Sequence, residues 1–489
     1  MRDINPQHYK FFLISLGLLA MASQVIILRE FIFVFYGNEL IIGVFLMLWM
    51  VFSGIGAYFK RWIFKKNEVF YISFVHLFFT IVPILSVWGL VELKNFFFPD
   101  GAILNFSKLI IICAIVLFPV SFISGFLFVS YSELISLKKN RNNIALTYVY
   151  DTIGSILGGI IVSFVFAYIG LTFQQLIVVS LLCLFALIYV WMKNKFLILH
   201  ALGFLTLTGL LVLLMTENLD YNYLSQVYSK QKIVKVKNTP YGKLVITELN
   251  GQQNIYENNQ LLHTEKDIVN SEESVHYCML QKNYPRKVLV LSGGLLSQLN
   301  EILKYDSVEI DYVDINPGVI EWINKDIIHK YNNLNLIHSD ARRYIRNARK
   351  KYDIVLINVN EPSTAQMNRF FTVDFYSELK KCLTKSGYIS FPLTSENNYV
   401  SDENAELLEI SYNTLKSVFK NVDIIPGQKN YFLASDSVIE PNIVKLYSYS
   451  YIENSYVTNL FLDSISMKIK QERIYSSFKG TCQVSQGCL

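Results

Sequence analysis

The chain has 489 residues, of which 52% are hydrophobic and 15% aromatic, and its formal net charge is +5. This length suits two or three domains, and the apolar content exceeds that of an ordinary soluble enzyme. The small net charge gives no nucleic-acid-binding footprint, and the six cysteines show no CxxC or Cys/His spacing, so neither a nucleic-acid partner nor a metal is expected.

Residues 1–216 are predicted to form a transmembrane domain of about seven helices. A helix needs about 20 apolar residues to cross a bilayer, and no small-residue cleavage site follows the first apolar run, which is therefore predicted to be a retained span. The lipid bilayer is an expected partner. The predicted spans are 10–33, 38–59, 69–91, 107–131, 146–168, 173–192 and 196–215.

Several residues interrupt the apolar runs. Arg29 and Glu30 end the first span, and Asp151 lies in YVYDTIGSILGGI. Ionisable groups inside a membrane often mark functional sites. The alternative is that Arg29 and Glu30 reach the membrane interface and that Asp151 caps the start of a helix, and both interpretations stay open. Gly154, Gly158 and Gly159 predict close helix packing, with a transport pathway as the alternative.

Basic residues follow every second predicted span, which predicts that these loops and the N-terminus are cytoplasmic. An odd number of spans would carry the rest of the chain to the opposite face, and an even number would return it to the cytoplasm. The residues concerned are Arg2, Lys10, Lys60, Arg61, Lys65, Lys66, Lys138, Lys139, Arg141, Lys193 and Lys195.

Beyond Glu217 the pattern changes to that of a soluble half. Residues 217–270 alternate apolar and polar positions around Pro-Tyr-Gly, Asn-Gly and Asn-Asn turns, which predicts a subdomain of antiparallel β-hairpins. Residues 271–439 alternate apolar strands with helices, which predicts an α/β doubly wound sheet. Residues 440–489 are predicted to be a helical C-terminal extension, in which Cys482 and Cys488 are either a disulfide or two free thiols.

Three successive strand ends carry residues suited to a nucleoside. Gly293 and Gly294 end the first strand, where backbone can approach a ligand closely. Asp314 ends the second strand about twenty residues later, where a carboxylate can accept bonds from both ribose hydroxyls. Asp340 ends the third strand. The alternative is that all of them are ordinary turn residues.

The soluble half resembles the spermidine synthase family of polyamine aminopropyltransferases, in the branch with fused N-terminal transmembrane helices. The resemblance rests on TPYG, EESVHYCML, VLVLSGG, YVDINP, HSDARRY, YDIVLINVNEP and FFTVDFYSELKKCL, in that order, and on MASQVIILREFIFVFYGNEL and YDTIGSILGG in the membrane half. It implies a Rossmann-like fold of the S-adenosylmethionine-methyltransferase type. It also implies transfer of a 3-aminopropyl group from decarboxylated S-adenosylmethionine, as substrate, to a small amine. Asp314 would bind the ribose, and Asp340 and Ala341 would border the adenine.

The sequence departs from the family at the chemistry. Leu295 stands where the family has an acid that holds the aminopropyl ammonium, and Asn358 stands where it has the Asp that helps to deprotonate the amine. Glu361 keeps a carboxylate three residues later, and His276–Tyr277 reverses the family's Tyr-His pair. The candidate catalytic residues are therefore Glu361, Asn358 and His276, with His276 either a substitute base or a structural helix residue.

Four functions remain open from the sequence: an aminopropyltransferase, a methyltransferase with a related adenosyl donor, a noncatalytic nucleoside-binding or assembly protein, and a carrier of a small cation. Asn368 and Arg369, beside the aromatic run that includes Phe370 and Phe371, are candidates for substrate contact. A homo-oligomer is left open. The expected location is the plasma (inner) membrane, with the soluble half on the cytoplasmic side because that side offers an adenosyl donor.

Overall fold

The structure is a computed structural model that describes residues 8–37, 39–62, 68–98, 105–136, 144–216, 218–327, 333–362, 364–395, 400–448, 452–458 and 464–478. Cys482 and Cys488 lie outside the described residues. The chain divides into two compact units, Met1–Leu249 with Glu257–Gln260 (unit 1) and Asn250–Tyr256 with Leu261–Leu489 (unit 2). The domain boundaries predicted after residues 216, 270 and 439 stay predictions.

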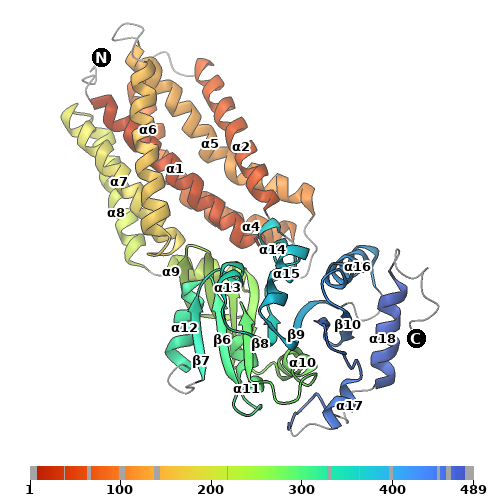
Figure 1. Ribbon diagram of the computed structural model, residues 1–489. Coiled ribbons are helices and arrows are strands. Elements are labelled where there is room, and N and C mark those ends of the chain that lie inside the picture. The colour runs from red at the N-terminus through yellow and green to blue at the C-terminus, as the bar shows by residue number, and fades with distance from the viewer. Residues whose placement is uncertain are drawn as a thin grey trace. The chain divides into compact units, whose positions relative to one another are not determined.

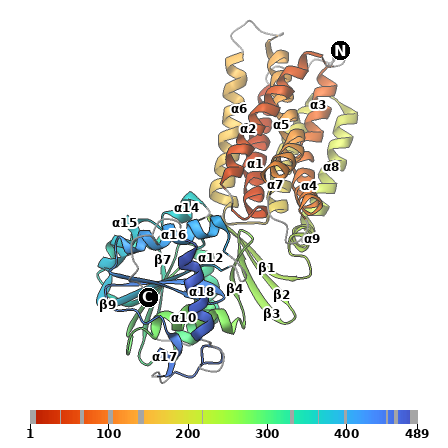
Figure 2. The same cartoon turned by 90° about the vertical axis from the view of Figure 1, so that its right-hand side faces the viewer.

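Unit 1 is a bundle of apolar helices (Figures 1 and 2). In the described residues, six of them are long and apolar enough to cross a membrane, and α3 with α4 would form a seventh span bent by 44°. The bend falls where Pro83 begins a new helix, because proline lacks the N–H that would continue the preceding one. The elements are α1 (Tyr9–Val34), α2 (Leu40–Phe59), η2 (Lys60–Trp62), α3 (Glu68–Phe79), α4 (Val82–Phe97), α5 (Phe106–Ser136), α6 (Ile144–Ile160), the π-helical η4 (Ile161–Phe166), α7 (Thr172–Lys193), α8 (Leu197–Met215) and α9 (Asn218–Val227).

Helices α1 and α6 approach each other at glycines. A Cβ added to Gly154 would lie 2.1 Å from the Ile14 carbonyl oxygen, and one added to Gly158 would lie 2.6 Å from that of Leu18. The predicted packing role is thus confirmed for these two glycines. Asp151 lies well inside α6, which begins at Ile144, so the alternative that it caps a helix start is wrong.

One end of the bundle gathers the start of α1 and the ends of α2, α5 and α7. The ring of Phe12 stacks on Tyr131 near the end of α5, with 5.3 Å between centroids. Lys60 forms an ion pair of 2.9 Å with Glu133 of α5, and Asn194 lies 3.1 Å from the ring nitrogen of His8. The loops rich in lysine and arginine leave from this end, which is called the basic end below.

The other end gathers the end of α1, the end of α4, the start of α7 and α9. Thr172 donates a 2.5 Å hydrogen bond to Glu30, the Phe173 N–H donates to Asp220 at 3.1 Å, and Gln226 donates to Glu92 at 2.8 Å. Strands β1 and β2 also belong to this end, which is called the hairpin end below. The chain therefore runs through the bundle seven times, counting α3 and α4 as one passage.

The predicted hairpins are confirmed. Strands β1 and β2 pair antiparallel around the Pro240–Tyr241 turn, with Thr239 opposite Gly242. The sheet has the order β1-β2-β3-β4. Its strands are β1 (Lys232–Thr239), β2 (Gly242–Leu249), β3 (Gln252–Glu257) and β4 (Gln260–Thr264).

Unit 2 contains a seven-stranded sheet in the order β10-β11-β9-β8-β5-β6-β7. Strands β5 to β9 run parallel to one another, and β11 runs antiparallel to both of its neighbours, β9 and β10. The predicted doubly wound domain is confirmed, and the strand order reverses between β5 and β8, where ligands bind in such sheets. The strands are β5 (Lys287–Leu291), β6 (Glu309–Asp314), β7 (Leu334–His338), β8 (Tyr352–Ile357), β9 (Leu383–Thr394), β10 (Asn421–Pro426) and β11 (Lys429–Ser435).

Helices cover the sheet on both faces, as buried apolar strands require. Leu289, Leu291, Val355 and Ile357 of the central strands are all at most 1% exposed and share one core with Phe375 of α15. The helices are α10 (Ile268–Met279), α11 (Leu295–Ile302), α12 (Pro317–Ile327), α13 (Ala341–Asn347), α14 (Ala365–Asn368), α15 (Val373–Lys381), α16 (Asp402–Lys416), α17 (Ile443–Ser448) and α18 (Ser464–Ser476).

Candidate active site

The turn after β5 is built from left-handed residues. Ser292, Gly293 and Gly294 have φ angles of 58°, 46° and 64°, and glycine adopts this conformation without strain. A Cβ on either glycine would lie 3.0 Å from an atom of Asn358, at the end of β8. The turn can therefore lie directly against the neighbouring strand only because both residues are glycine. Leu295 follows as the first residue of α11, and its side chain lies outside the described part.

Asn358 is held by a reciprocal amide pair. Its Nδ2 donates to Gln298 Oε1 at 2.8 Å, and Gln298 Nε2 donates to its Oδ1 at 3.0 Å. Gln298 Nε2 also donates to the hydroxyl of Ser274 on α10, at 2.9 Å. These bonds join α10, α11 and the end of β8. Both amide ends of Asn358 are thus engaged with another side chain.

A cavity of about 230 Å³ lies in unit 2 beside this turn. Gly293, Gly294, Asn358 and Glu361 line it, so the structure brings four of the predicted site residues together. Other lining residues, which the sequence analysis did not select, are Asp267, Asn270, Ser274, Gln298, His263 and Lys429.

The cavity wall carries two carboxylates and one ammonium group. Glu361 accepts a 2.5 Å bond from the Thr394 backbone N–H and a second from the Thr394 hydroxyl, both on Oε1, so no described residue donates to Oε2. Asp267 caps α10 by accepting from the Asn270 N–H at 3.2 Å. Burial lowers the pKa of His263 to about 4, so this ring is neutral near pH 7. The carboxylates of Asp267 and Glu361 outweigh the single positive charge of Lys429, so the wall has a net negative charge.

Asp314 ends β6 and does not line this cavity. Its carboxylate accepts bonds from the Tyr312 hydroxyl at 2.9 Å, the Ser292 hydroxyl at 3.2 Å and the Asn316 N–H at 2.7 Å. Burial raises its pKa above the ordinary range, although these bonds act in the opposite direction. The Gly293 N–H acts on this carboxylate in the same direction as these bonds, and the ribose-binding role stays a prediction.

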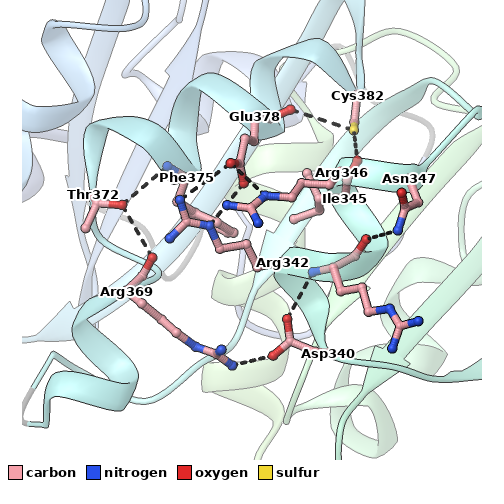
Figure 3. Close-up of polar contacts among 11 residues, drawn as sticks. Asp340, Arg342, Ile345, Arg346, Asn347, Arg369, Thr372, Phe375, Glu378 and Cys382 are labelled. Atoms are coloured by element: carbon pink, nitrogen blue, oxygen red, sulfur yellow. Dashed lines mark hydrogen bonds and ion pairs between the residues drawn. The ribbon is translucent and has the colours of Figure 1, made fainter.

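Asp340 begins α13 and is paired with Arg369 (Figure 3). It also accepts the Arg343 N–H at 3.0 Å, while the guanidinium carbon of Arg369 lies 4.6 Å from the centre of the Phe370 ring. Ala341 is buried in the core. Neither Asp340 nor Ala341 lines the cavity, so their adenine contact also stays a prediction.

His276 is fully buried on α10 and does not line the cavity. One ring nitrogen lies 2.8 Å from the Tyr305 hydroxyl, and the other lies 2.9 Å from a carboxylate oxygen of Glu301. Burial lowers its pKa below the ordinary range, which outweighs the effect of Glu301. This environment fits the structural alternative for His276 better than the role of a base.

Gln298, Ser274 and Asp267 were missed; the position of the last two depends on how α10 packs against the strand ends, whereas Gln298 lies on α11. A Gln one turn after a Gly-Gly pair was the only local signal for the first of them. Asp267 could have been found as a helix N-cap, since it directly precedes the apolar start of α10. The sequence offered no signal for Lys429, which lies on the outermost strand pair.

The sequence of unit 2 is similar to that of known proteins. Residues 268–426 match the family "Spermine/spermidine synthase domain". The polyamine aminopropyltransferase of Oceanobacillus iheyensis is 26% identical over 264 residues, covering 50% of this chain and 51% of the relative. That of Saccharolobus solfataricus is 31% identical over 201 residues, covering 39% and 62%.

A crystal structure of spermidine synthase in complex with the transition-state analogue AdoDATO is 19% identical, with a TM-score of 0.43, and covers 50% of this chain and 88% of that chain. The chain spans about half the length of the first curated relatives that it matches. Residues 268–426 of this chain are thus similar to the spermine/spermidine synthase domain.

Proposed function

We propose that this protein is a membrane-embedded transferase that moves an aminopropyl group from decarboxylated S-adenosylmethionine to a small amine. The observation that carries the proposal is the cavity of unit 2, where the glycine turn after β5 and the carboxylates of Asp267 and Glu361 share one wall. Both substrates are cations, and a negatively charged cavity raises their local concentration. The names of the relatives support the same class of reaction.

Glu361 is the proposed base. An amine attacks only when its nitrogen carries a free electron pair, so a proton must first leave it. The free Oε2 of Glu361 accepts that proton. The nitrogen then bonds to the aminopropyl carbon next to sulfur, the carbon–sulfur bond breaks, and its electron pair neutralises the sulfonium to give methylthioadenosine.

The amide pair of Asn358 and Gln298 favours a second candidate, a nucleoside-binding protein without turnover. A neutral, fully engaged amide at the end of β8 takes no proton. One assay separates the two functions. The purified full chain is incubated with decarboxylated S-adenosylmethionine and putrescine or spermidine, and products are identified by mass spectrometry.

The transferase proposal predicts an aminopropylated amine and methylthioadenosine in equal amounts. Glu361→Gln should lower the rate by about 10²–10⁴-fold, the usual range for a general base, with donor binding unchanged. Glu403→Gln, on the exposed face of α16, is the control and should keep full activity. Methylthioadenosine binding without any aminopropylated product would favour the noncatalytic candidate instead.

We further propose that the protein spans the plasma (inner) membrane with its basic end in the cytoplasm. Lys60, Arg61, Lys65 and Lys66 leave from that end, as do the basic residues after α5 and α7. The connections at the hairpin end, residues 35–39, 98–105 and 167–171, contain no lysine or arginine. Such an asymmetry sets the orientation of multi-pass proteins.

Seven passages then carry the chain from residue 218 onward to the face opposite the cytoplasm. This proposal differs from the cytoplasmic location expected from the sequence, and it requires that the amine and the donor reach the cavity on that outer face. Reporters that are active on only one side, fused after Lys139 and after Leu489, test it. We expect the first on the cytoplasmic side and the second outside; two reporters on the same side would contradict seven passages.

A further inference from the structure

A second cavity lies within unit 1, at the hairpin end of the bundle, and has a volume of about 140 Å³. Its wall combines three charged residues with an apolar side from α1: Arg29, Glu30, Lys243, Ile26, Ile32 and Phe33. No residue of the proposed transferase site contributes to it. The sequence analysis singled out Arg29 and Glu30, and the transferase proposal uses neither.

Glu30 is neutralised by residues that surround it. Lys243 of β2 forms an ion pair of 2.6 Å with its Oε1, Thr172 donates to the same oxygen at 2.5 Å, and Tyr223 donates to Oε2 at 3.0 Å. Both charged side chains are no more than 6% exposed. A buried pair that is fully hydrogen-bonded in this way is a fixed part of the wall.

Arg29 keeps a positive charge that acts on Glu30 only at a distance, without a direct ion pair in the described residues. Among the described residues, its guanidinium makes one hydrogen bond, to the Thr239 carbonyl oxygen at 3.1 Å, and no ion pair. The other acid nearby is Asp220, which accepts the Phe173 N–H at 3.1 Å and does not line the cavity. Burial raises the pKa of Asp220 to about 6, so it carries a negative charge near pH 7, and the charged groups that act on it are Lys243 and Glu30.

We propose that the hairpin-end cavity binds one phosphate group through Arg29. A guanidinium presents parallel N–H donors that match phosphate oxygens. Two positive charges and one negative charge line a partly apolar hollow, which favours an anion. A volume of about 140 Å³ exceeds several times the roughly 30 Å³ of one water molecule, so a phosphate group fits.

The phosphate has two sources, a free anion or the headgroup of an anionic lipid. Arg29 lies in the last turns of the first candidate span, where a membrane helix meets the headgroup region of the bilayer. Inorganic phosphate offers the same oxygens without acyl chains. The experiment therefore uses both.

The test is native mass spectrometry of the full chain, delipidated in detergent and titrated separately with three probes. The probes are inorganic phosphate, short-chain phosphatidylglycerol, and a diacylglycerol with the same chains but no phosphate. We expect a single bound phosphate or phosphatidylglycerol and no bound diacylglycerol at the same concentration. Binding of phosphatidylglycerol alone identifies a headgroup site, and binding of both identifies a site for the phosphate group itself.

Arg29→Gln should weaken this binding at least about tenfold, equivalent to roughly 1.4 kcal/mol, whereas Arg29→Lys should retain part of it. Ile32→Glu, which adds a negative charge to the wall without changing Arg29, should weaken it similarly. Lys193→Gln removes an exposed positive charge of α7 and is the matched control. The proposal would be overturned if wild type bound neither phosphate probe, or if diacylglycerol bound equally well. Full binding by Ile32→Glu and Arg29→Gln would also overturn it.

Discussion

At the scale of single residues, Asn358 is a position at which the site differs from the family that the chain resembles. The side chain accepts one bond from Gln298 and donates another to it, so its two ends are chemically distinct. An aspartate at this position would keep the first bond and turn the second into a contact between two acceptors. The neutral amide therefore fits its neighbours better than the acid that the family has at this position.

Asn358→Asp should accordingly destabilise unit 2, by about 1–3 kcal/mol, the usual range for a buried polar group that loses its partner. Thermal unfolding of the full chain measures the effect. Asn300→Asp, at an exposed position of α11, makes the same chemical change without a buried partner and should leave the unfolding temperature unchanged. Equal unfolding temperatures for Asn358→Asp and wild type would show that the amide pair is not structurally required.

At the scale of elements, α10 joins the cavity to the outer strands. Ser274 lines the cavity, and on the same helix Glu273 accepts the Gln428 N–H at 2.7 Å, in the turn between β10 and β11. A Cβ at Gly427 would lie 2.4 Å from that carboxylate, so the turn closes tightly over it. Lys429 of the cavity wall follows two residues later.

Burial raises the pKa of Glu273 to about 7, from an ordinary value of 4.5. The folded state therefore binds more protons than the unfolded state between these values, and the stability of unit 2 should fall as the pH rises through this window. The shift corresponds to roughly 3 kcal/mol at most. Glu273→Gln, which keeps the bond from Gln428, should flatten this slope in unfolding measured from pH 4.5 to 7.5; a slope equal to that of wild type would assign it to another group.

The sequence predicted the elements better than their junctions. Strands β5 to β8 were predicted correctly because each is a mainly apolar run joined to the next by a helix. The span predicted over residues 69–91 is two helices, because Pro83 starts a second one. Gly293 and Gly294 were found because they end a strand, and Asn358 and Glu361 were found through the family resemblance. Ser274 was missed because only the packing of α10 brings it there, and Gln298, on α11, because only its pairing with Asn358 marks it.

At the scale of the whole molecule, the chain divides into two units that each bury their own core. Units of this kind unfold in separate steps when their cores do not depend on each other. Calorimetry of the full chain in detergent should therefore show two unfolding transitions. A ligand or substitution that acts on one unit should change the temperature of only that unit's transition.

Methylthioadenosine, a product of the proposed reaction, should raise the unfolding temperature of unit 2 only. At a hundred times its dissociation constant, a ligand stabilises the folded state by about 2.7 kcal/mol, or roughly 5–10 °C for a unit of this size. Asp314→Ala should abolish most of this shift if its carboxylate binds the ribose. Gly154→Leu should instead lower only the transition of unit 1, because its side chain would collide with the Ile14 carbonyl of α1. A single transition whose temperature changes with both the ligand and Gly154→Leu would mean that the two units unfold as one. If methylthioadenosine shifts the transition of Asp314→Ala as much as that of wild type, the Asp314 carboxylate does not bind the ribose.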